Sequence, residues 1–407
     1  MGVEPQEAQG HSGAAREVFL AFLRLGLTSF GGPVAHIGYF RQEFVARRKW
    51  LDDRAFTDLV ALCQFLPGPA SSQVGIALGL SRAGYIGAFA AWTAFTLPSA
   101  ALLIVFAYGI SAIGGAAGSA WIHGLKIAAV AVVAQAVLGM MRSLTPDRER
   151  ATLAVAAASV ALAIPTAWGQ VAIIALGGFV GSALLRGDRS PSAPDPAALP
   201  LTVGRATGVV SLLMFFVLLF GLPMLAAAMH SKPIDLVNAF YRSGSLVFGG
   251  GHVVLPLLQS EVVPPGWVTN DQFLAGYGAA QAVPGPLFTF AAYLGAVMGG
   301  WSTAAVCLLA VFAPSFLLVI GALPFWQELR SRTWAQSALR GINAAVVGLL
   351  LAALYDPVWS AGIRGTKDFA IAMAAFVALY MWSVTPWLVV LLCALAAGGL
   401  SMLTGQL

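Results

Sequence analysis

Long apolar stretches, separated by short polar ones, follow one another along almost the whole chain. When the shorter stretches are included, about thirteen approach the roughly 20 residues that a bilayer-spanning helix needs. They begin near Glu17, Ala55, Gly84, Trp121, Ala151, Trp168, Gly208, Ile234, Gln272, Trp301, Trp334, Lys367 and Pro386. This pattern predicts an all-α polytopic membrane protein.

Composition supports this class and excludes a soluble enzyme. Hydrophobic residues make up 59% of the 407 residues and charged residues only 10%, whereas soluble domains carry about 25% charged residues. The mean hydropathy is +0.83. The 45 glycines and 22 prolines indicate helices that are interrupted inside the membrane, where neighbouring groups can satisfy the freed backbone.

The polar segments suggest a division into five regions. Residues 1–15 hold no hydrophobic signal-peptide core, so we expect an amino-terminal cytoplasmic tail there. Residues 186–205 read RGDRSPSAPDPAALPLTVGR, which is typical of a polar linker. The remaining regions are a first repeat at 16–185, a connecting transmembrane helix at 206–230 and a second repeat at 231–407.

The two predicted repeats can be aligned as copies of one another. RLGLTSFGGPVAHI, which starts at Arg24, corresponds to RSGSLVFGGGHVVL, which starts at Arg242. QFLPGP, which starts at Gln64, corresponds to QAVPGP, which starts at Gln281. Further matches follow at a near-constant offset: Trp50 with Trp267, Phe56 with Phe273, Leu78-Gly79 with Leu294-Gly295, Pro98-Ser99 with Pro314-Ser315, and Gly124 with Gly341.

Charges in equivalent loops indicate that the two copies have opposite orientations in the membrane. Residues 41–54 are rich in Arg and Lys, whereas their counterpart, residues 259–271, contains Glu261 and Asp271 and no basic residue. Basic loops stay in the cytoplasm, so the first loop is expected inside and the second outside. The apolar segment at 208–228 supplies the odd crossing that inverted repeats require.

The first two segments of each copy carry a Gly or Pro break near the middle. If all of the roughly thirteen stretches crossed the bilayer, the basic loops at 142–150 and 330–332 would lie outside, against the charge rule. If the FGG and PGP segments are re-entrant hairpins, about nine crossings remain and the rule holds. We therefore expect two inverted-topology homologous repeats with broken or re-entrant helices.

The Gly and Pro breaks can also create binding sites for anions. Gly31-Gly32 and Gly68 permit a turn, while Pro33 and Pro69 suit the first position of the helix that follows. Helix amino termini inside the protein present free N–H groups and a partial positive charge, and these bind oxyanions. The alternative is that Gly and Pro only allow close helix packing.

The predicted oxyanion site combines these breaks with nearby donors. Its candidate residues are Arg24, Ser29, Gly31, Gly32, Pro33, Gln64, Pro67, Gly68, Pro69, Ser71, Arg242, Gly249, Gly250, Gln281, Pro284, Gly285 and Pro286. The second copy has Gly251 where the first has Pro33, so a less rigid helix start is expected there.

Four basic or titratable residues lie near the glycine breaks, and a fifth, Lys126, lies near the start of an apolar segment. Arg24 and Arg242 recur at matched positions, which favours an anion-attracting role over simple snorkelling to the interface. His36, His252 and Lys126 are candidates for a proton or anion relay. A polar filler role for the histidines and snorkelling for Lys126 are the alternatives.

Other chemistries are disfavoured. Every Asp and Glu is expected at a segment end or in a loop, so no carboxylate cluster can hold a metal or serve a membrane enzyme. Cys63, Cys307 and Cys393 are isolated in apolar stretches, and no phosphate-binding GxxxxGK[ST] motif is present. We expect no cofactor, no bound metal and no enzymatic activity, and no nucleic-acid partner.

The paired FGGP and PGP motifs, at residues 30–33 and 67–69, and their second copies, at residues 248–251 and 284–286, resemble those of the chromate ion transporter family. The resemblance spans residues 16–403 and is to the long-chain, two-domain form. It implies a multi-pass protein of the bacterial inner membrane that exports chromate, confers chromate resistance and uses the proton motive force. It also implies that Arg24, the FGGP run, Gln64 and the PGP run matter for transport.

Residue types alone leave the anion open. Chromate and sulfate are both tetrahedral dianions, and helix amino termini and arginines attract either one. The alternatives to a chromate exporter are a sulfate or general oxyanion transporter or exchanger, an anion channel and a lipid-handling protein. The expected partners are chromate or a related oxyanion and the lipid bilayer, with the protein acting as a monomer or a homodimer.

Overall fold

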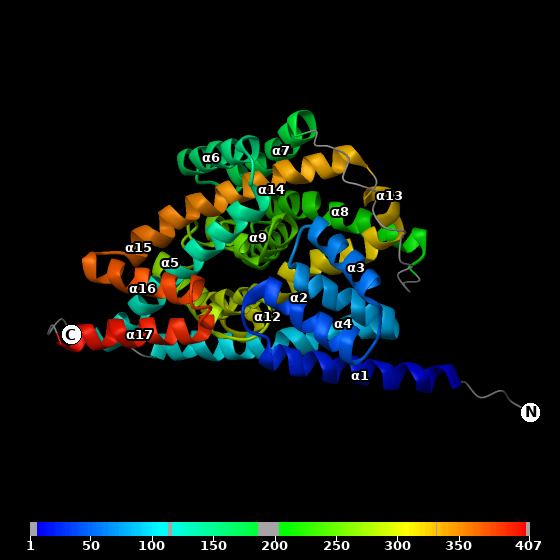
Figure 1. Cartoon of the computed structure of the whole chain (residues 1–407), viewed down its shortest axis with the longest axis horizontal. Helices are drawn as coiled ribbons and strands as arrows, with labels where there is room; N and C mark the ends of the chain where they lie inside the picture. Colours follow the sequence, from blue (N-terminus) through cyan, green and yellow to red (C-terminus); the bar gives the residue numbers. More distant parts are fainter. Residues whose placement is uncertain (1–5, 113–115, 186–202, 331, 404–407) are drawn as a thin grey trace, which may run out of the picture.

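The computed structural model describes residues 6–112, 116–185, 203–330 and 332–403, and within these ranges the elements are helices with no strand (Figure 1). Most of the predicted linker, residues 186–202, and the first five residues lie outside the described residues. Helix α1 already begins at Gln6, so the predicted amino-terminal tail is partly helical. The all-α membrane fold is confirmed.

The helices of the first half and the connecting helix match the predicted segments closely. They are α1 (Gln6–Thr28), α2 (Gly32–Phe40), the π-helix η1 (Arg41–Arg47), α3 (Asp53–Phe65), α4 (Ala70–Ala112), α5 (Ala116–Leu144), α6 (Arg148–Ala163), α7 (Ala167–Leu184) and α8 (Arg205–Met229).

The second half repeats this order. Its elements are α9 (Lys232–Leu246), η2 (Gly251–Val253), α10 (Val254–Val262), α11 (Asn270–Ala282), η3 (Leu287–Thr289), α12 (Phe290–Ala322), η4 (Leu323–Phe325), α13 (Trp326–Arg330), α14 (Thr333–Ala353), η5 (Leu354–Trp359), α15 (Ser360–Gly362), α16 (Thr366–Tyr380) and α17 (Pro386–Leu403).

The first four segments form two re-entrant hairpins that open on the same face. Glu17, midway along α1, accepts hydrogen bonds from Arg48 at 3.1 Å and from Arg82 at 3.0 Å. Arg48 follows the end of η1, and Arg82 lies near the end of the first part of α4. Arg48 and Arg82 thus both return to the level of Glu17. The first hairpin, α1 with α2 and η1, and the second, α3 with the start of α4, therefore each begin and end on the same side of the molecule and do not cross it.

Phenylalanine rings fill the first hairpin. The ring of Phe22 in α1 stacks on that of Phe44 with centroids 4.8 Å apart and meets Phe40 edge-on at 5.5 Å. Phe40 in turn contacts Phe95 of α4 at 5.2 Å. Buried aromatic pairs contribute about 0.5–1.5 kcal/mol each beyond their burial. They hold the two arms of the hairpin against the long helix behind it.

Both long helices, α4 and α12, reverse direction inside. Backbone angles leave the helical region at Ala83 and Gly84, and again at Gly299 and Gly300, and the second residue of each pair is a glycine with a positive φ, 62° at Gly84 and 82° at Gly300. After the first reversal the chain packs back on itself so closely that a Cβ on Gly79 would lie 2.2 Å from the Gly87 carbonyl oxygen. The predicted segment starts at Gly84 and Trp301 fall at these turns.

Six of the described helical segments are long and apolar enough to span a bilayer: 70–110, 120–144, 167–184, 205–229, 287–329 and 333–362. The segment at 205–229 is the predicted connecting helix. Since the segments at 70–110 and 287–329 each contain a reversal, each combines one arm of a hairpin with one longer helix. The estimate of about nine crossings remains a prediction.

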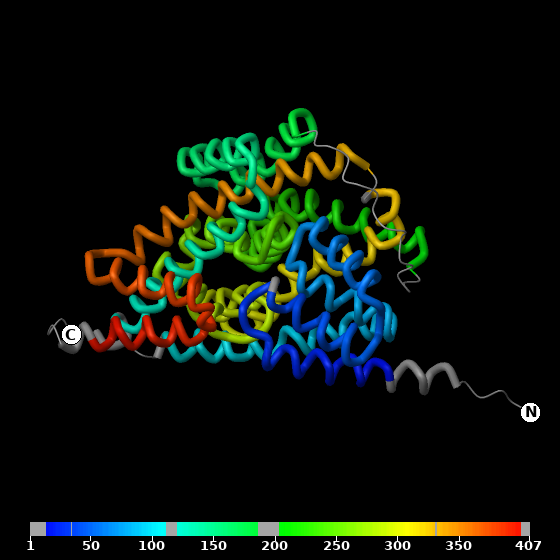
Figure 2. The backbone as a smooth tube through the Cα atoms, viewed as in Figure 1, coloured from blue at the N-terminus to red at the C-terminus, as the bar shows by residue number. Residues whose placement is uncertain are grey.

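The two halves are packed together rather than placed end to end. Helix α14 of the second half runs diagonally beneath α6 and α7 of the first, and α17 lies along α5 (Figure 1). The tube in Figure 2 shows α1, in blue, and α17, in red, along the same edge of the molecule. A single large core of buried apolar side chains draws on both halves.

Candidate functional site

Each Pro-Gly-Pro loop is hydrogen-bonded to the glycine break of the opposite half. The Gly68 N–H donates to the carbonyl oxygen of Val247, with N and O 2.7 Å apart, and the Gly285 N–H donates to that of Ser29 at 2.9 Å. Val247 and Ser29 are equivalent residues of the two copies, each preceding the Phe-Gly-Gly run. The two bonds therefore form a reciprocal pair across the interface between the halves.

The same reciprocity extends to the long helices. A Cβ on Gly68 would lie 2.9 Å from Ser315 Oγ in α12, and one on Gly285 would lie 2.9 Å from Ser99 Oγ in α4. Both glycines have positive φ, 122° and 93°. Since an L side chain is strained in that conformation and no space is left for it, glycine is required at the centre of each loop.

Several helices begin where the Gly68 and Gly285 loops meet the glycine breaks of the opposite halves, a place that we call the crossing. Helix α2 starts at Gly32 with Pro33 in its first turn, and α4 starts directly after the loop that contains Gly68. In the second half, η2 starts at Gly251 and η3 follows Pro286. A Cβ on Gly251 would lie 3.4 Å from Pro33 Cγ, so the equivalent starts of the two halves touch. The second half starts with a 3-10 turn at Gly251, where the first half has Pro33, and this agrees with the less rigid start that we expected there.

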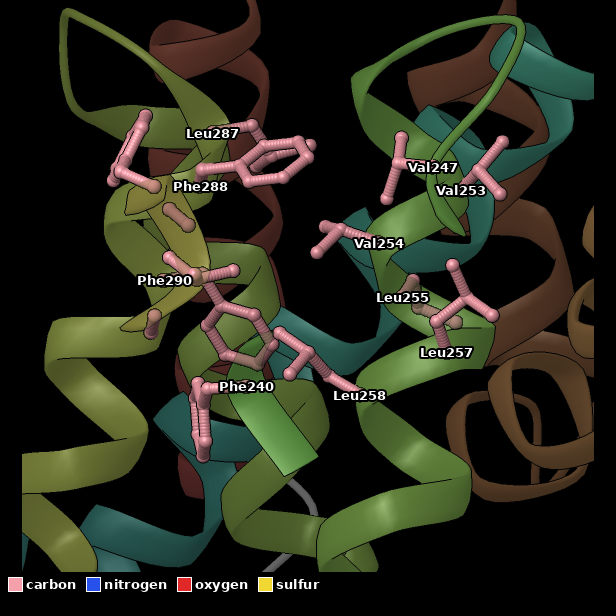
Figure 3. Close-up of a cluster of buried hydrophobic side chains, with 14 of the residues drawn as sticks. Phe240, Val247, Val253, Val254, Leu255, Leu257, Leu258, Leu287, Phe288 and Phe290 are labelled. Atoms are coloured by element: carbon pink, nitrogen blue, oxygen red, sulfur yellow. The ribbon is translucent and has the colours of Figure 1, made fainter. Parts of the chain in front are cut away.

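Apolar side chains surround the crossing in the second half. Figure 3 shows residues of α9, η2, α10 and η3, among them Val247, Val253, Leu287 and Phe288, gathered beside the two loops. Val247 and Val253 are fully buried and Phe288 is nearly so. The hydrogen bond between Gly68 and Val247 is thus shielded from water, which strengthens it, while Gly31 and Gly249 of the glycine breaks are exposed.

Buried polar atoms without a hydrogen-bond partner among the described residues lie on the elements that form the crossing. Among them are Ser29 Oγ, Ser72 Oγ, Gln73 Oε1, Thr96 Oγ1, Gln281 Nε2 and Ser315 Oγ. Buried polar groups are normally paired, so a concentration of unpaired ones marks a place where a ligand or water can supply the missing bonds.

Family comparison agrees with the two-copy organisation. The chromate transporter family model matches residues 16–182 and again 234–398. The chain belongs to the chromate transporter family. No solved structure gives a significant match.

Two curated relatives of this chromate transporter family member are similar over most of its length and a third over one third of it. A chromate transport protein of Pseudomonas aeruginosa is 28% identical over 376 residues, which is 90% of this chain and 87% of that protein. One of Cupriavidus metallidurans is 26% identical, with 83% and 81% covered. YwrA, an uncharacterized transporter of Bacillus subtilis, is 34% identical over 136 residues, or 33% of this chain and 74% of YwrA.

His36 lies directly at the crossing of this chromate transporter family member. Its Nε2 is 3.2 Å from the Ser29 carbonyl oxygen, which also accepts from Gly285, and its Nδ1 is 3.3 Å from Ser71 Oγ. Because a carbonyl only accepts, Nε2 carries the proton and Nδ1 accepts from the Ser71 hydroxyl. His252 is placed differently, with Nδ1 2.8 Å from the hydroxyl of buried Tyr277.

The two predicted glutamines and Lys126 separate into different environments. Gln281 is partly buried with its Nε2 unpartnered among the described residues, whereas Gln64 is exposed. Lys126 is buried, and its Nζ donates to Asp271 at 2.8 Å, which ties α5 to the start of α11. Asp271 is itself largely exposed, so this pair is compatible with snorkelling, and a relay role for Lys126 stays a prediction.

Arg24 and Arg242 also differ. Arg24 is exposed on α1, whereas Arg242 is buried and forms a bidentate pair with Glu261, at 2.8 Å and 2.6 Å. Among the described residues, neither arginine forms a hydrogen bond or ion pair with the Pro-Gly-Pro loops, so the structure does not bring them together with Gly68 and Gly285.

The expectation that all carboxylates lie at segment ends or in loops is wrong for Glu43, whereas Glu261 does lie at the end of a helix, although it is buried there. Glu43 is buried in η1 and Glu261 lies in α10 with only 10% of its side chain exposed. Glu43 and Glu261 occupy matched positions in the two copies, and this recurrence could have singled them out from the sequence. The chain continues as helix beyond each glycine break, so the stretches assumed to be loops start later than predicted.

No group of three or more His, Cys, Asp or Glu side chains that could hold a metal occurs among the described residues. The arrangement offers instead N–H groups, hydroxyls and an amide. Such donors can replace part of the hydration shell of an oxyanion without a fixed side-chain charge.

Proposed function

We propose that this protein exports chromate from the bacterial cytoplasm by secondary transport and thereby confers chromate resistance. The observation that carries the proposal is the crossing itself, where each Pro-Gly-Pro loop bonds to the glycine break of the opposite half and the flanking elements carry buried polar atoms without partners among the described residues. Membership of the chromate transporter family supports a tetrahedral oxyanion as the substrate.

The anion would bind between the two reciprocal loops. Its oxygens would accept hydrogen bonds from the Ser29, Ser72 and Ser315 hydroxyls and from the Gln281 amide, together with backbone N–H groups at the helix starts. Oriented N–H dipoles in a dry site suit an anion that must be released again, because they carry no full charge.

The two repeats, 16–185 and 231–407, would act as the moving halves of an alternating-access cycle, joined by the linker at 186–205 and the helix at 206–230. Reciprocal contacts between inverted halves support such a cycle, since the same contacts can be broken on either side in turn. The arginine-rich face at Arg48 and Arg82 would lie in the cytoplasm of the bacterial inner membrane.

Uptake of radiolabelled chromate into inverted inner-membrane vesicles tests the proposal. We expect accumulation that depends on an imposed proton gradient and persists in the presence of equimolar sulfate. Accumulation abolished by equimolar sulfate would make the protein a general oxyanion carrier, and flux that continues after the gradient is collapsed would make it a channel. No accumulation in vesicles that contain the protein would overturn the proposal.

A further inference from the structure

The matched arginine and glutamate of the second hairpin form a closed pair. Arg242 Nε donates to Glu261 Oε1 at 2.8 Å and Nη2 donates to Oε2 at 2.6 Å. The guanidinium lies over the ring of Trp168, 4.8 Å from its centroid. Only 10% of each charged side chain is exposed, so no cavity separates them.

The equivalent residues of the first hairpin are apart. Glu43 pairs instead with Arg47 at 2.9 Å and with Arg48 at 2.6 Å. Arg24 is exposed and has no ion-pair partner within the described ranges. A cavity of about 430 Å³ lies between the arms, lined by Arg24, Thr28, Tyr39, Gln42, Glu43 and Arg47.

The charges around this cavity are unbalanced. Arg47, Arg48 and Arg82 bond to only two carboxylates, Glu17 and Glu43, and Arg24 adds a further positive charge. The cavity has the volume of an ordinary small-ligand pocket, about 300–1,000 Å³. Arg24 and Arg47 against Glu43 give the lining itself a net positive charge, which fits a small anion better than a cation.

We propose that this cavity is an entry site for tetrahedral oxyanion dianions, and that the Arg242–Glu261 pair is the closed form of the equivalent site in the second hairpin. The inference rests on the proposed function for its place in transport, because an entry site is useful only to a carrier of such anions. In its closed state the first hairpin would pair Arg24 with Glu43, in place of Arg47 and Arg48, as the second hairpin pairs Arg242 with Glu261. The two hairpins would then exchange their open and closed states.

A cysteine at Thr28 probes the cavity directly. Thr28 lines it, is exposed, and donates its hydroxyl to the carbonyl four residues earlier at 2.8 Å. Thr57 is the matched control, since it is exposed, does not line the cavity, and makes the same bond at 2.8 Å. The native Cys63, Cys307 and Cys393 are buried, so they give little background with polar thiol reagents.

We expect the anionic thiol reagent to modify Thr28→Cys about tenfold faster than a cationic one of similar size, because a positive cleft concentrates anions. Sulfate and molybdate, which do not oxidise thiols as chromate does, should slow that reaction. Thr57→Cys should show neither effect. In the second half, Leu246→Cys, equivalent to Thr28→Cys, should react more slowly because the pair there is closed.

Adding Arg24→Gln to Thr28→Cys should remove most of the preference for the anionic reagent. Equal rates for the two reagents at Thr28→Cys, or no protection by either sulfate or molybdate, would overturn the entry site. Chromate accumulation in vesicles with the native chain is scored separately. Protection without chromate transport would contradict the proposed function and leave the anion site standing. Transport without protection would contradict the anion site and leave the proposed function standing.

Discussion

Glycine at the centre of each Pro-Gly-Pro loop is required by both conformation and space. At Gly68, φ is +122°, and a Cβ would lie 2.6 Å from Gln73 Nε2 and 2.9 Å from Ser315 Oγ. A non-glycine residue held in such a conformation costs of order 1–3 kcal/mol, and its side chain would push on the hydroxyl proposed to bind substrate.

Gly68→Ala should therefore reduce the initial rate of chromate accumulation in vesicles by about tenfold or more, which corresponds to roughly 1.4 kcal/mol. Gly221→Ala is the matched control, because no atom lies within 4 Å of a Cβ there. Protein in the membrane would be quantified by immunoblot. A native rate for Gly68→Ala would show that the loop tolerates a side chain and that its geometry is not needed.

The Ser315 hydroxyl is buried and unpartnered among the described residues, whereas that of its equivalent, Ser99, donates to the Thr96 carbonyl. A hydrogen bond to a charged group contributes about 1.5–3 kcal/mol. Ser315→Ala is thus expected to raise the KM for chromate by roughly tenfold or more. Ser302→Ala, on the exposed part of the same helix, should leave it unchanged. An unaltered KM in Ser315→Ala would exclude this contact.

Helix ends outside the membrane-spanning segments are stabilised by ordinary caps. Asp147 accepts the Arg150 N–H at the start of α6, and this hydrogen bond helps to hold the pKa of Asp147 below its usual value. Asp147→Ala should lower the free energy of unfolding by about 1 kcal/mol, measured by thermal unfolding in detergent.

The stabilisation by the Asp147 cap should weaken as the pH falls. A carboxylate whose pKa is lowered by folding stabilises the protein above its unfolded pKa and loses this effect as the pH falls. The stability difference between the native chain and Asp147→Asn should therefore shrink below about pH 4. A difference that is constant from neutral to acidic pH would mean that the charge of Asp147 contributes nothing.

At the level of elements, much could be predicted from the sequence because duplication exposes the pattern. The recurrence of Phe-Gly-Gly and Pro-Gly-Pro predicted the breaks, and Gly84 and Trp301 mark the reversals of the two long helices. Pairing between side chains could not be predicted. Whether Arg24 or Arg48 reaches Glu43 depends on the relative rotation of two hairpin arms, and repeat symmetry alone would have given both halves the same pair.

For the whole molecule, the reciprocal hydrogen bonds mean that neither half can complete its own loop. Gly68 needs the Val247 carbonyl and Gly285 needs that of Ser29. If the chain is divided between Leu185 and Val203, each half alone should give no chromate accumulation, while the two halves produced together should restore it. Immunoblots of both halves in the membrane are the control. Transport by one half alone would contradict the shared site, unless that half pairs with a second copy of itself.

The separation of the bonded residues along the chain has a consequence for biosynthesis. Gly68 reaches the membrane 179 residues before Val247 does, and at about 5–20 residues per second the ribosome takes roughly 10–40 s to make that stretch. During this interval the first hairpins are inserted with an unsatisfied loop. Membrane chaperones and quality-control proteases can recognise a nascent chain at this stage. If translation is arrested before Val247, chaperones should bind the chain and proteases should cleave it.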